Sequence, residues 1–249
     1  MDAIATYALR LGDDSLILGQ RLSEWCGHAP ALEVDLSLAN VALDQVGQAT
    51  HFLNLAAELE GKGRDGDALA FRRDVMDFTN CLLVEQPNGD FAQTIARQLL
   101  FSHYQELLFT ALTASKNATI AAIAAKAVKE TAYHATLASD WVVRLGDGTE
   151  ESKTRMIAGL DWMWRFADEL FVMDDVDAAA VAAGVGVDKA SLRAAWDARI
   201  DATLAEATLA RPAPRRATTG GRVGRHSEHL GHLLSDMQFL QRAYPGATW

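Results

Sequence analysis

Apolar residues recur every three to four positions along almost the whole chain, and alternating runs of β-branched residues are scarce. This period is that of amphipathic helices, so the pattern predicts an all-α fold. Glycines, prolines and one Pro-Asn-Gly turn interrupt it at the places where helices should end. The expected helices cover about 4–26, 31–60, 91–115, 118–145, 150–171, 188–209 and 227–243, with a short acidic helix after the fifth.

The first four of these helices are each longer than twenty residues and form two hairpins, at about 4–60 and 91–145. The long connection between the hairpins lets the second cross over the first, as in ferritin-like antiparallel four-helix bundles. No repeat or low-complexity linker separates two cores. We therefore predict a single ferritin-like domain over 1–249, with a core bundle at about 4–145 and additional C-terminal helices at about 150–245.

Charge and composition exclude several classes of protein. A formal net charge of -10 and a pI near 5.1 argue against binding to nucleic acid or to an anionic membrane, since both require a basic surface. No stretch has the pattern of a signal peptide, and none is apolar over the length of a bilayer. Cys26 and Cys81 form no CxxC pair, which suits two reduced thiols. We expect a cytoplasmic protein.

A ferritin-like bundle raises the question of a di-iron site. Such a site takes one Glu from each of two helices and a Glu-x-x-His pair from each of the other two. Counting residues outward from the two expected turns, near Ala29 and Asn117, predicts which positions lie at the same height along the bundle axis. We call the height at which ligands would lie the predicted level. The predicted level holds Asp13 (with Asp14), Asp44, Gly47, Ser102, His103, Thr131 and His134.

These residues do not make a ligand set. Asp44 is followed three residues later by Gly47, and His134 is preceded three residues earlier by Thr131, so neither pair is Glu-x-x-His. Oxygen-activating di-iron centres need several carboxylates, and we therefore predict a vacated site with neither metal nor catalytic residues. Opportunistic metal binding near His103 stays open. In place of metal we expect a buried polar network of Asp44, Lys126, Lys129, Glu130 and His134, because buried charges persist only when paired.

Two motifs near the C-terminus have alternative interpretations. HSEHLGH (226–232) spaces three histidines along one helix side, which is either a zinc site or an ordinary capped helix start. GGRVGR (220–225) is either a phosphate loop or part of a docking arm for an acidic partner. We favour the arm, and its candidate partner-binding residues are Arg215, Arg216, Arg222 and Arg225.

Several longer stretches resemble a known family. They are RLSEWCGHAPALEVDLSLANVALDQVGQA, LLVEQPNGDFAQTIARQ, KAVKETAYH, LRAAWDA and TGGRVGRHSEHLGHLLSDMQFLQRAYPGATW. They are similar to the C subunits of bacterial phenylacetyl-CoA epoxidases, the multicomponent ring 1,2-phenylacetyl-CoA monooxygenases, over essentially 7–249. The resemblance implies a ferritin-like structural subunit that is not itself catalytic.

The resemblance also implies partners and cofactors. A homologous A subunit would carry the di-iron centre, a B subunit would bridge, and a reductase with flavin and an iron-sulfur cluster would supply electrons from NADPH. Phenylacetyl-CoA would be the substrate of the complex, and this subunit would hold no cofactor. Residues Asp77, Phe78, Thr79 and Asn80 are candidates to touch the CoA end of the substrate; the alternative is a capped turn. The rival function is a self-sufficient ferritin-like di-iron oxidase, which would need the full ligand set.

Overall fold

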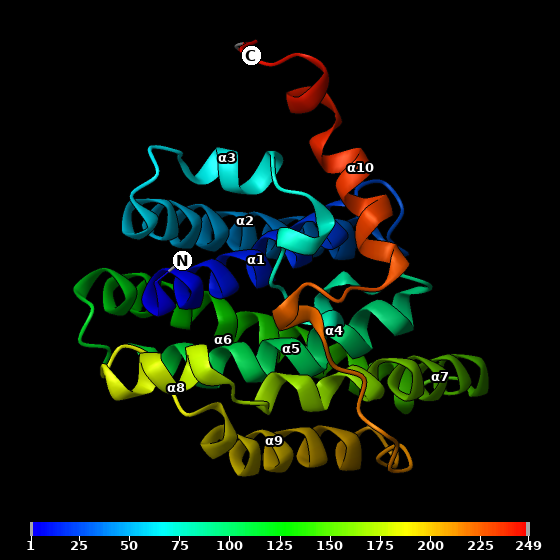
Figure 1. Ribbon diagram of the computed structural model, residues 1–249. Coiled ribbons are helices and arrows are strands. Elements are labelled where there is room, and N and C mark those ends of the chain that lie inside the picture. Colours follow the sequence, from blue (N-terminus) through cyan, green and yellow to red (C-terminus); the bar gives the residue numbers. More distant parts are fainter. Residues whose placement is uncertain (1, 248–249) are drawn as a thin grey trace. The chain divides into compact units, whose positions relative to one another are not determined.

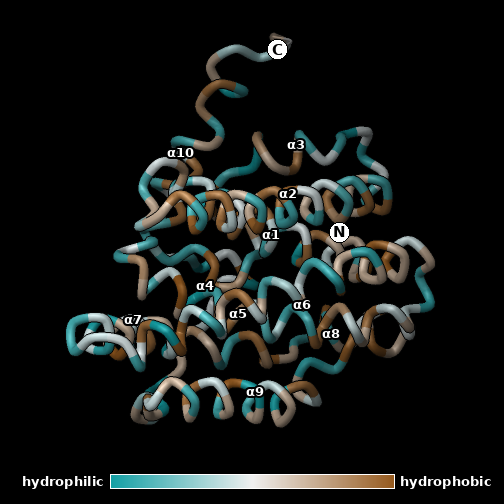
Figure 2. Tube along the Cα trace, turned by 180° about the vertical axis from the view of Figure 1, so that it is seen from behind, coloured by the Kyte–Doolittle hydropathy of each residue, from teal (hydrophilic) through white to brown (hydrophobic). Residues whose placement is uncertain are grey.

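The computed structural model describes residues 2–247, and within them every regular element is helical (Figure 1). Ten α-helices and four short 3-10 helices lie in this range, with no strand. The predicted all-α fold is confirmed. Hydrophobic and hydrophilic residues follow one another along each helix (Figure 2), as amphipathic helices require. None of the described helices is both long enough and apolar enough to cross a membrane.

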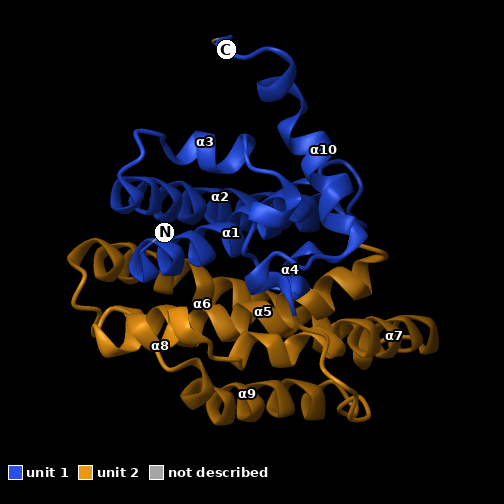
Figure 3. Cartoon of the chain, in the orientation of Figure 1, with its two compact units in different colours: residues 1–86, 220–249 blue, residues 87–219 orange. Residues whose placement is uncertain are grey.

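The chain divides into two compact units (Figure 3). The first contains the described residues up to Gln86 and from Gly220 onward, and the second is Pro87–Thr219. Each of the two predicted hairpins therefore belongs to a different unit. The four-helix bundle that would combine them, and the single domain, stay predictions.

The first unit is built on the hairpin of α1 (Ala3–Ser23) and α2 (Leu32–Glu60). Gly61 ends α2 with a φ of 67°, a left-handed conformation that favours glycine. The remaining elements are α3 (Gly66–Phe71), η1 (Val75–Asp77), α4 (Leu82–Glu85), η4 (Gly221–Val223) and α10 (Glu228–Ala243). The sequence did not predict α3 and α4, since helices of six and four residues are too short to show a period.

The register of the first hairpin differs from the predicted one. A Cβ added at Gly12 would lie 2.7 Å from Cδ2 of Leu53, and one at Gly19 would lie 3.3 Å from the carbonyl oxygen of Ala42. Asp44 therefore lies nearer the level of Gly19 than that of Asp13, so the count from the turn was wrong. The connection is not a tight turn: the N–H of Gly27 donates to Asp35 Oδ2 at 2.7 Å, so the loop runs beside the start of α2.

The second unit contains the hairpin of α5 (Phe91–Leu112) and α6 (Ala118–Gly146). Asp90 and Asn117 cap these helices by accepting hydrogen bonds from backbone N–H groups of the first turns, a role that short polar side chains favour. The elements that follow are α7 (Glu150–Ala167), η2 (Asp168–Phe171), α8 (Asp175–Ala182), η3 (Lys189–Leu192) and α9 (Arg193–Glu206). Trp196 fixes α9 to α5, because its buried indole N–H donates to the carbonyl of Leu100 at 2.9 Å.

Candidate functional site

The first carboxylate of α1, Asp13, is fully buried. Arg73 forms an ion pair with both of its oxygens, one of them at 2.9 Å from Nη1. Thr79 adds its backbone N–H at 2.8 Å and its hydroxyl at 2.9 Å. The guanidinium carbon of Arg73 also lies 4.1 Å from the ring centroid of Phe78. Asp13 is thus held by donors from the segment that precedes α4.

The second carboxylate, Asp14, is held from the C-terminal part of the unit. Arg222 donates to both oxygens, at 3.0 and 2.7 Å, in the bidentate geometry of strong arginine–carboxylate pairs. The N–H of Cys81 donates to Oδ1 at 2.7 Å. The same guanidinium also donates to the carbonyl of Thr79 at 3.0 Å. Neighbouring residues of α1 therefore take cations from positions 73 and 222, far apart in the sequence.

A third carboxylate, Glu85, lies at the end of α4 and is fully buried. Ser227 donates to Oε1 through its N–H and its hydroxyl, and the amide of Asn80 donates to Oε2 at 2.9 Å. His226 places Nδ1 at 2.7 Å from Oε2 and Nε2 at 2.9 Å from the carbonyl oxygen of Phe78. With Glu85 ionised, both neighbouring oxygens are acceptors, and the geometry suits a ring that carries hydrogen on both nitrogens.

The protonation of His226 has a clear electrostatic cause. Burial alone would lower its pKa, but the hydrogen bond and charge of Glu85, with the carbonyl of Phe78, raise the pKa above its ordinary 6.5. The side chain of His226 is 1% exposed. These contacts therefore stabilise the protonated form of the buried ring.

Three acids and three cations thus form one buried set, which we call the carboxylate network. Its members are Asp13, Asp14, Glu85, Arg73, Arg222 and His226. The network fastens residues 220–227 to α1 and α4. Gly221 allows this approach, because a Cβ at that position would collide with the carbonyl oxygen of Asn80. Removing one member of a buried ion pair typically costs about 3–5 kcal/mol.

The α1 carboxylates do not suit a metal ion. The oxygens of Asp13 and Asp14 accept N–H and O–H donors, and an arginine beside each carboxylate would repel a cation. Among the described residues, no three or more His, Cys, Asp or Glu side chains are grouped so as to hold a metal ion. The residues of the predicted level do not fit a di-iron centre.

The predicted level in the second unit is also not assembled as expected. His103 Nε2 lies 2.9 Å from the hydroxyl of Ser139, a residue outside the predicted level. Ser139 is five residues beyond His134, which is about 7.5 Å along a helix axis. The predicted register of this hairpin was therefore wrong as well. Ser102 is buried, and its hydroxyl has no hydrogen-bond partner among the described residues.

His103 and Thr131 have local roles in this unit. Burial, and secondly the charge of Arg199, lower the pKa of His103 from 6.5 to about 4, so it is neutral near pH 7. The Thr131 hydroxyl donates to the carbonyl of Ala127 in its own helix at 3.0 Å. His134 is 1% exposed, with its ring centroid 6.2 Å from that of Tyr133.

The prediction that Lys126 and Lys129 belong to a buried network with Asp44 is wrong. Lys126 and Lys129 are exposed, and Asp44 is only half-buried. A Cβ at Gly47 would meet no described atom within 4 Å. The surface of α2 at Gly47 is therefore open.

The candidate substrate and partner residues have the following places. Phe78 and Asn80 are buried and Thr79 is half-buried; the Thr79 hydroxyl and the side-chain N–H of Asn80 donate inside the unit. Asp77 is exposed, in the capping box of η1. Arg222 belongs to the carboxylate network, so it is not the exposed arm residue that the sequence predicted. The other three candidate arginines, Arg215, Arg216 and Arg225, are exposed, and Arg215 pairs with Asp161.

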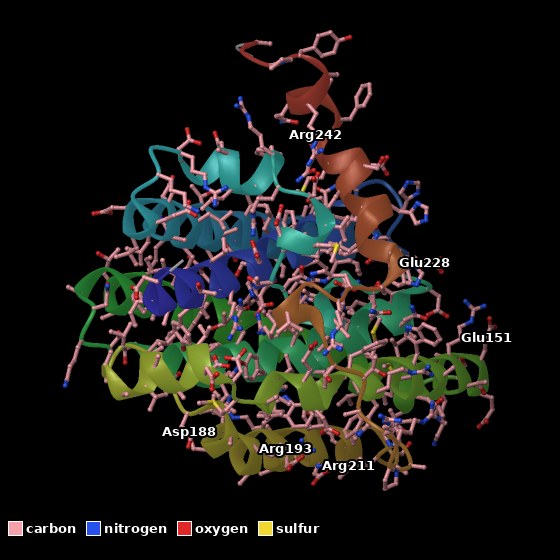
Figure 4. The ribbon with its side chains drawn as sticks, in the orientation of Figure 1. Glu151, Asp188, Arg193, Arg211, Glu228 and Arg242 are labelled. Atoms are coloured by element: carbon pink, nitrogen blue, oxygen red, sulfur yellow. The ribbon has the colours of Figure 1, made fainter. Side chains whose placement is uncertain are left out.

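Two further basic or histidine-rich features also have internal partners. Arg211, labelled in Figure 4, pairs with Asp197 at 2.7 Å and with Asp201 at 2.6 Å. His226 is committed to Glu85, so the three-histidine zinc interpretation loses one of its ligands. The network itself was missed from sequence. Its local signals were Glu85, a lone acid at the end of an apolar run, and the glycines on both sides of Arg222.

Comparison with known proteins agrees with the resemblance seen in the sequence. The model of the phenylacetic acid catabolic protein family matches residues 1–249. The chain is also 51% identical, over the full length of both proteins, to the C subunit of the 1,2-phenylacetyl-CoA epoxidase of Escherichia coli K12. A match over the whole chain leaves no segment outside this family. The chain therefore belongs to the phenylacetic acid catabolic protein family.

Proposed function

We propose that this chain is the non-catalytic structural subunit of a phenylacetyl-CoA 1,2-epoxidase in aerobic phenylacetate degradation. In that role it stabilises a homologous, iron-bearing A subunit in the cytoplasm. A B subunit and a reductase with flavin, an iron-sulfur cluster and NADPH complete the complex. The relative in Escherichia coli is named as one subunit of such an enzyme, and this supports the assignment.

The observation that carries the proposal is the state of the α1 carboxylates. Asp13 and Asp14 are each paired with an arginine, and Thr131 stands three residues before His134 where a ligand carboxylate is needed. The other components must then supply the oxygen chemistry. A subunit that keeps the helices but not the metal ligands contributes a binding surface and stability to the complex.

Substrate contact through residues 77–80 stays a prediction, and it depends on which of these side chains are exposed. The one exposed side chain of this stretch is Asp77. A carboxylate repels the phosphates of CoA unless a cation intervenes. Any contribution to substrate binding is therefore expected to be small, and Asp77→Asn should leave KM for phenylacetyl-CoA within about twofold of wild type, below the tenfold that 1.4 kcal/mol would give.

Iron content and co-purification test the proposal. The chain should be purified alone and after co-expression with the A subunit, and iron per chain measured in both samples. We expect iron only in the co-purified complex, and phenylacetyl-CoA epoxidation only when the A subunit, reductase and NADPH are present. About two irons per chain in the protein purified alone, with activity that does not need the A subunit, would establish the rival self-sufficient oxidase.

A further inference from the structure

Helix α2 carries a row of exposed apolar side chains. Leu32, Leu36, Leu43 and Val46 are 72, 57, 69 and 41% exposed. With half-buried Ala39 and exposed Thr50 they are spaced by alternating steps of four and three residues. We call these six positions (32, 36, 39, 43, 46 and 50) the α2 stripe. Figure 2 shows hydrophobic residues recurring along this helix.

The spacing identifies the kind of surface that the stripe would take. Steps of three and four residues average 3.5, the period of a seam that faces a second helix in a coiled coil. From Leu32 to Val46 the seam is about 21 Å long, at 1.5 Å per residue. Leucines in a continuous row are not the scattered exposed apolar residues that ordinary surfaces carry. The shape therefore fits one helix of another chain.

The flanks of the stripe indicate the charge of that helix. Glu33, Asp35 and Asp44 lie beside it, and α2 contains no lysine or arginine. Two copies of α2 would bring like charges together, which disfavours self-association through this seam. A helix with Lys or Arg beside its apolar row would be attracted.

The surface next to the stripe leaves room for close approach. Gly47 adjoins Val46, and a Cβ placed on it would meet no described atom within 4 Å. Ala39 is a small residue in the middle of the row. Small side chains between large ones let a neighbouring backbone come near while the leucines interdigitate.

We propose that the α2 stripe is the docking seam for an apolar, basic-flanked helix of the A subunit. This inference rests on the proposed function, since it takes the A subunit as the partner. It goes further by assigning the contact to one helix face. The apolar side chains provide the affinity, and the acidic flanks select the partner.

The test uses the full chain co-expressed with a tagged A subunit. Leu36→Glu with Leu43→Glu should lower affinity by about 100-fold or more, since two buried interface leucines and two added charges are affected. Ile157→Glu is the matched control, because Ile157 is 51% exposed on α7. A photo-crosslinking amino acid at Leu43 should link to the A subunit, and one at Ile157 should not. Glu33→Lys should weaken binding several-fold, and less so at high salt.

The outcomes separate this inference from the proposed function. If wild type and the double variant bind the A subunit equally and residue 43 gives no crosslink, the seam is wrong and the structural-subunit proposal stands. If wild type does not bind the A subunit, both proposals fail. If the chain alone is a dimer that the double variant dissociates, the occupant is a second copy. Crosslinking at Leu43 decides the case even if the double variant folds poorly.

Discussion

Replacing Asp14 tests the carboxylate network most directly. Asp14 is 4% exposed and accepts two hydrogen bonds from Arg222 and one from the N–H of Cys81. Asp14→Ala removes the carboxylate that neutralises the buried guanidinium, which keeps its hydrogen bond to the carbonyl of Thr79. Stranding such a charge costs about 3–5 kcal/mol. For a chain of this length that is a fall in Tm of roughly 6–20 °C.

A matched control and a double-mutant cycle isolate the ion pair. Asp161→Ala removes the partner of Arg215, whose side chain is 37% exposed, and an exposed pair contributes at most about 1 kcal/mol. Arg222→Met in the Asp14→Ala background should restore part of the lost stability, because the stranded charge is then gone. Urea unfolding of wild type, Asp14→Ala, Arg222→Met and the double variant gives the coupling energy between Asp14 and Arg222. Equal losses for Asp14→Ala and Asp161→Ala, or additive effects in the cycle, would refute the reasoning.

Three further predictions concern single residues. Because the pKa of His103 is lowered to about 4 from 6.5, its protonation favours the unfolded chain, and stability should fall by up to about 3 kcal/mol as pH drops from 6.5 to 4; His103→Gln should flatten this slope in urea titrations. For His226 the pKa is raised, so its stabilisation is complete below about pH 6.5 and is lost as pH rises through the folded-state pKa; hydrogen exchange of residues 220–227 should accelerate there, and a pH-independent rate after correction for intrinsic exchange would contradict this. Gly221→Ala should lower Tm because its Cβ meets the carbonyl of Asn80. Gly47→Ala, in open space, should raise the free energy of unfolding by roughly 0.5–1 kcal/mol, the preference of a helix for alanine over glycine.

The sequence predicted the long helices well, and physical reasons explain why. Helices such as α2 and α6 span 29 residues each, enough for many repeats of the 3.6-residue period, and glycine or short polar caps mark their ends. The register between the two helices of each hairpin was harder to predict, because it depends on the path of the connecting loop. At Gly27 the loop runs beside α2, and a count that assumes a symmetrical turn then places Asp44 beside the wrong residues.

The carboxylate network was not predictable from local pattern. Arg73 is 60 residues from Asp13, and Arg222 is 208 residues from Asp14. Nothing in the spacing of a single helix marks such partners, since arginines on the surface and in a buried pair look alike in sequence. Arg222, in the motif Gly-Gly-Arg-Val-Gly-Arg, was therefore interpreted as exposed. The glycines around it were a signal of a close backbone approach.

The carboxylate network also bears on how the first unit keeps its shape. Buried carboxylates on α1 need a compensating positive charge, which a metal ion supplies in di-iron bundles. Here Arg73 and Arg222 supply it for Asp13 and Asp14, and each also donates to a backbone carbonyl, of Asp77 and Thr79. The same contacts that neutralise α1 thus fix the segments before α4 and before α10. Removing an arginine to make room for a metal would release these segments, so a single arginine substitution is not expected to create a metal site.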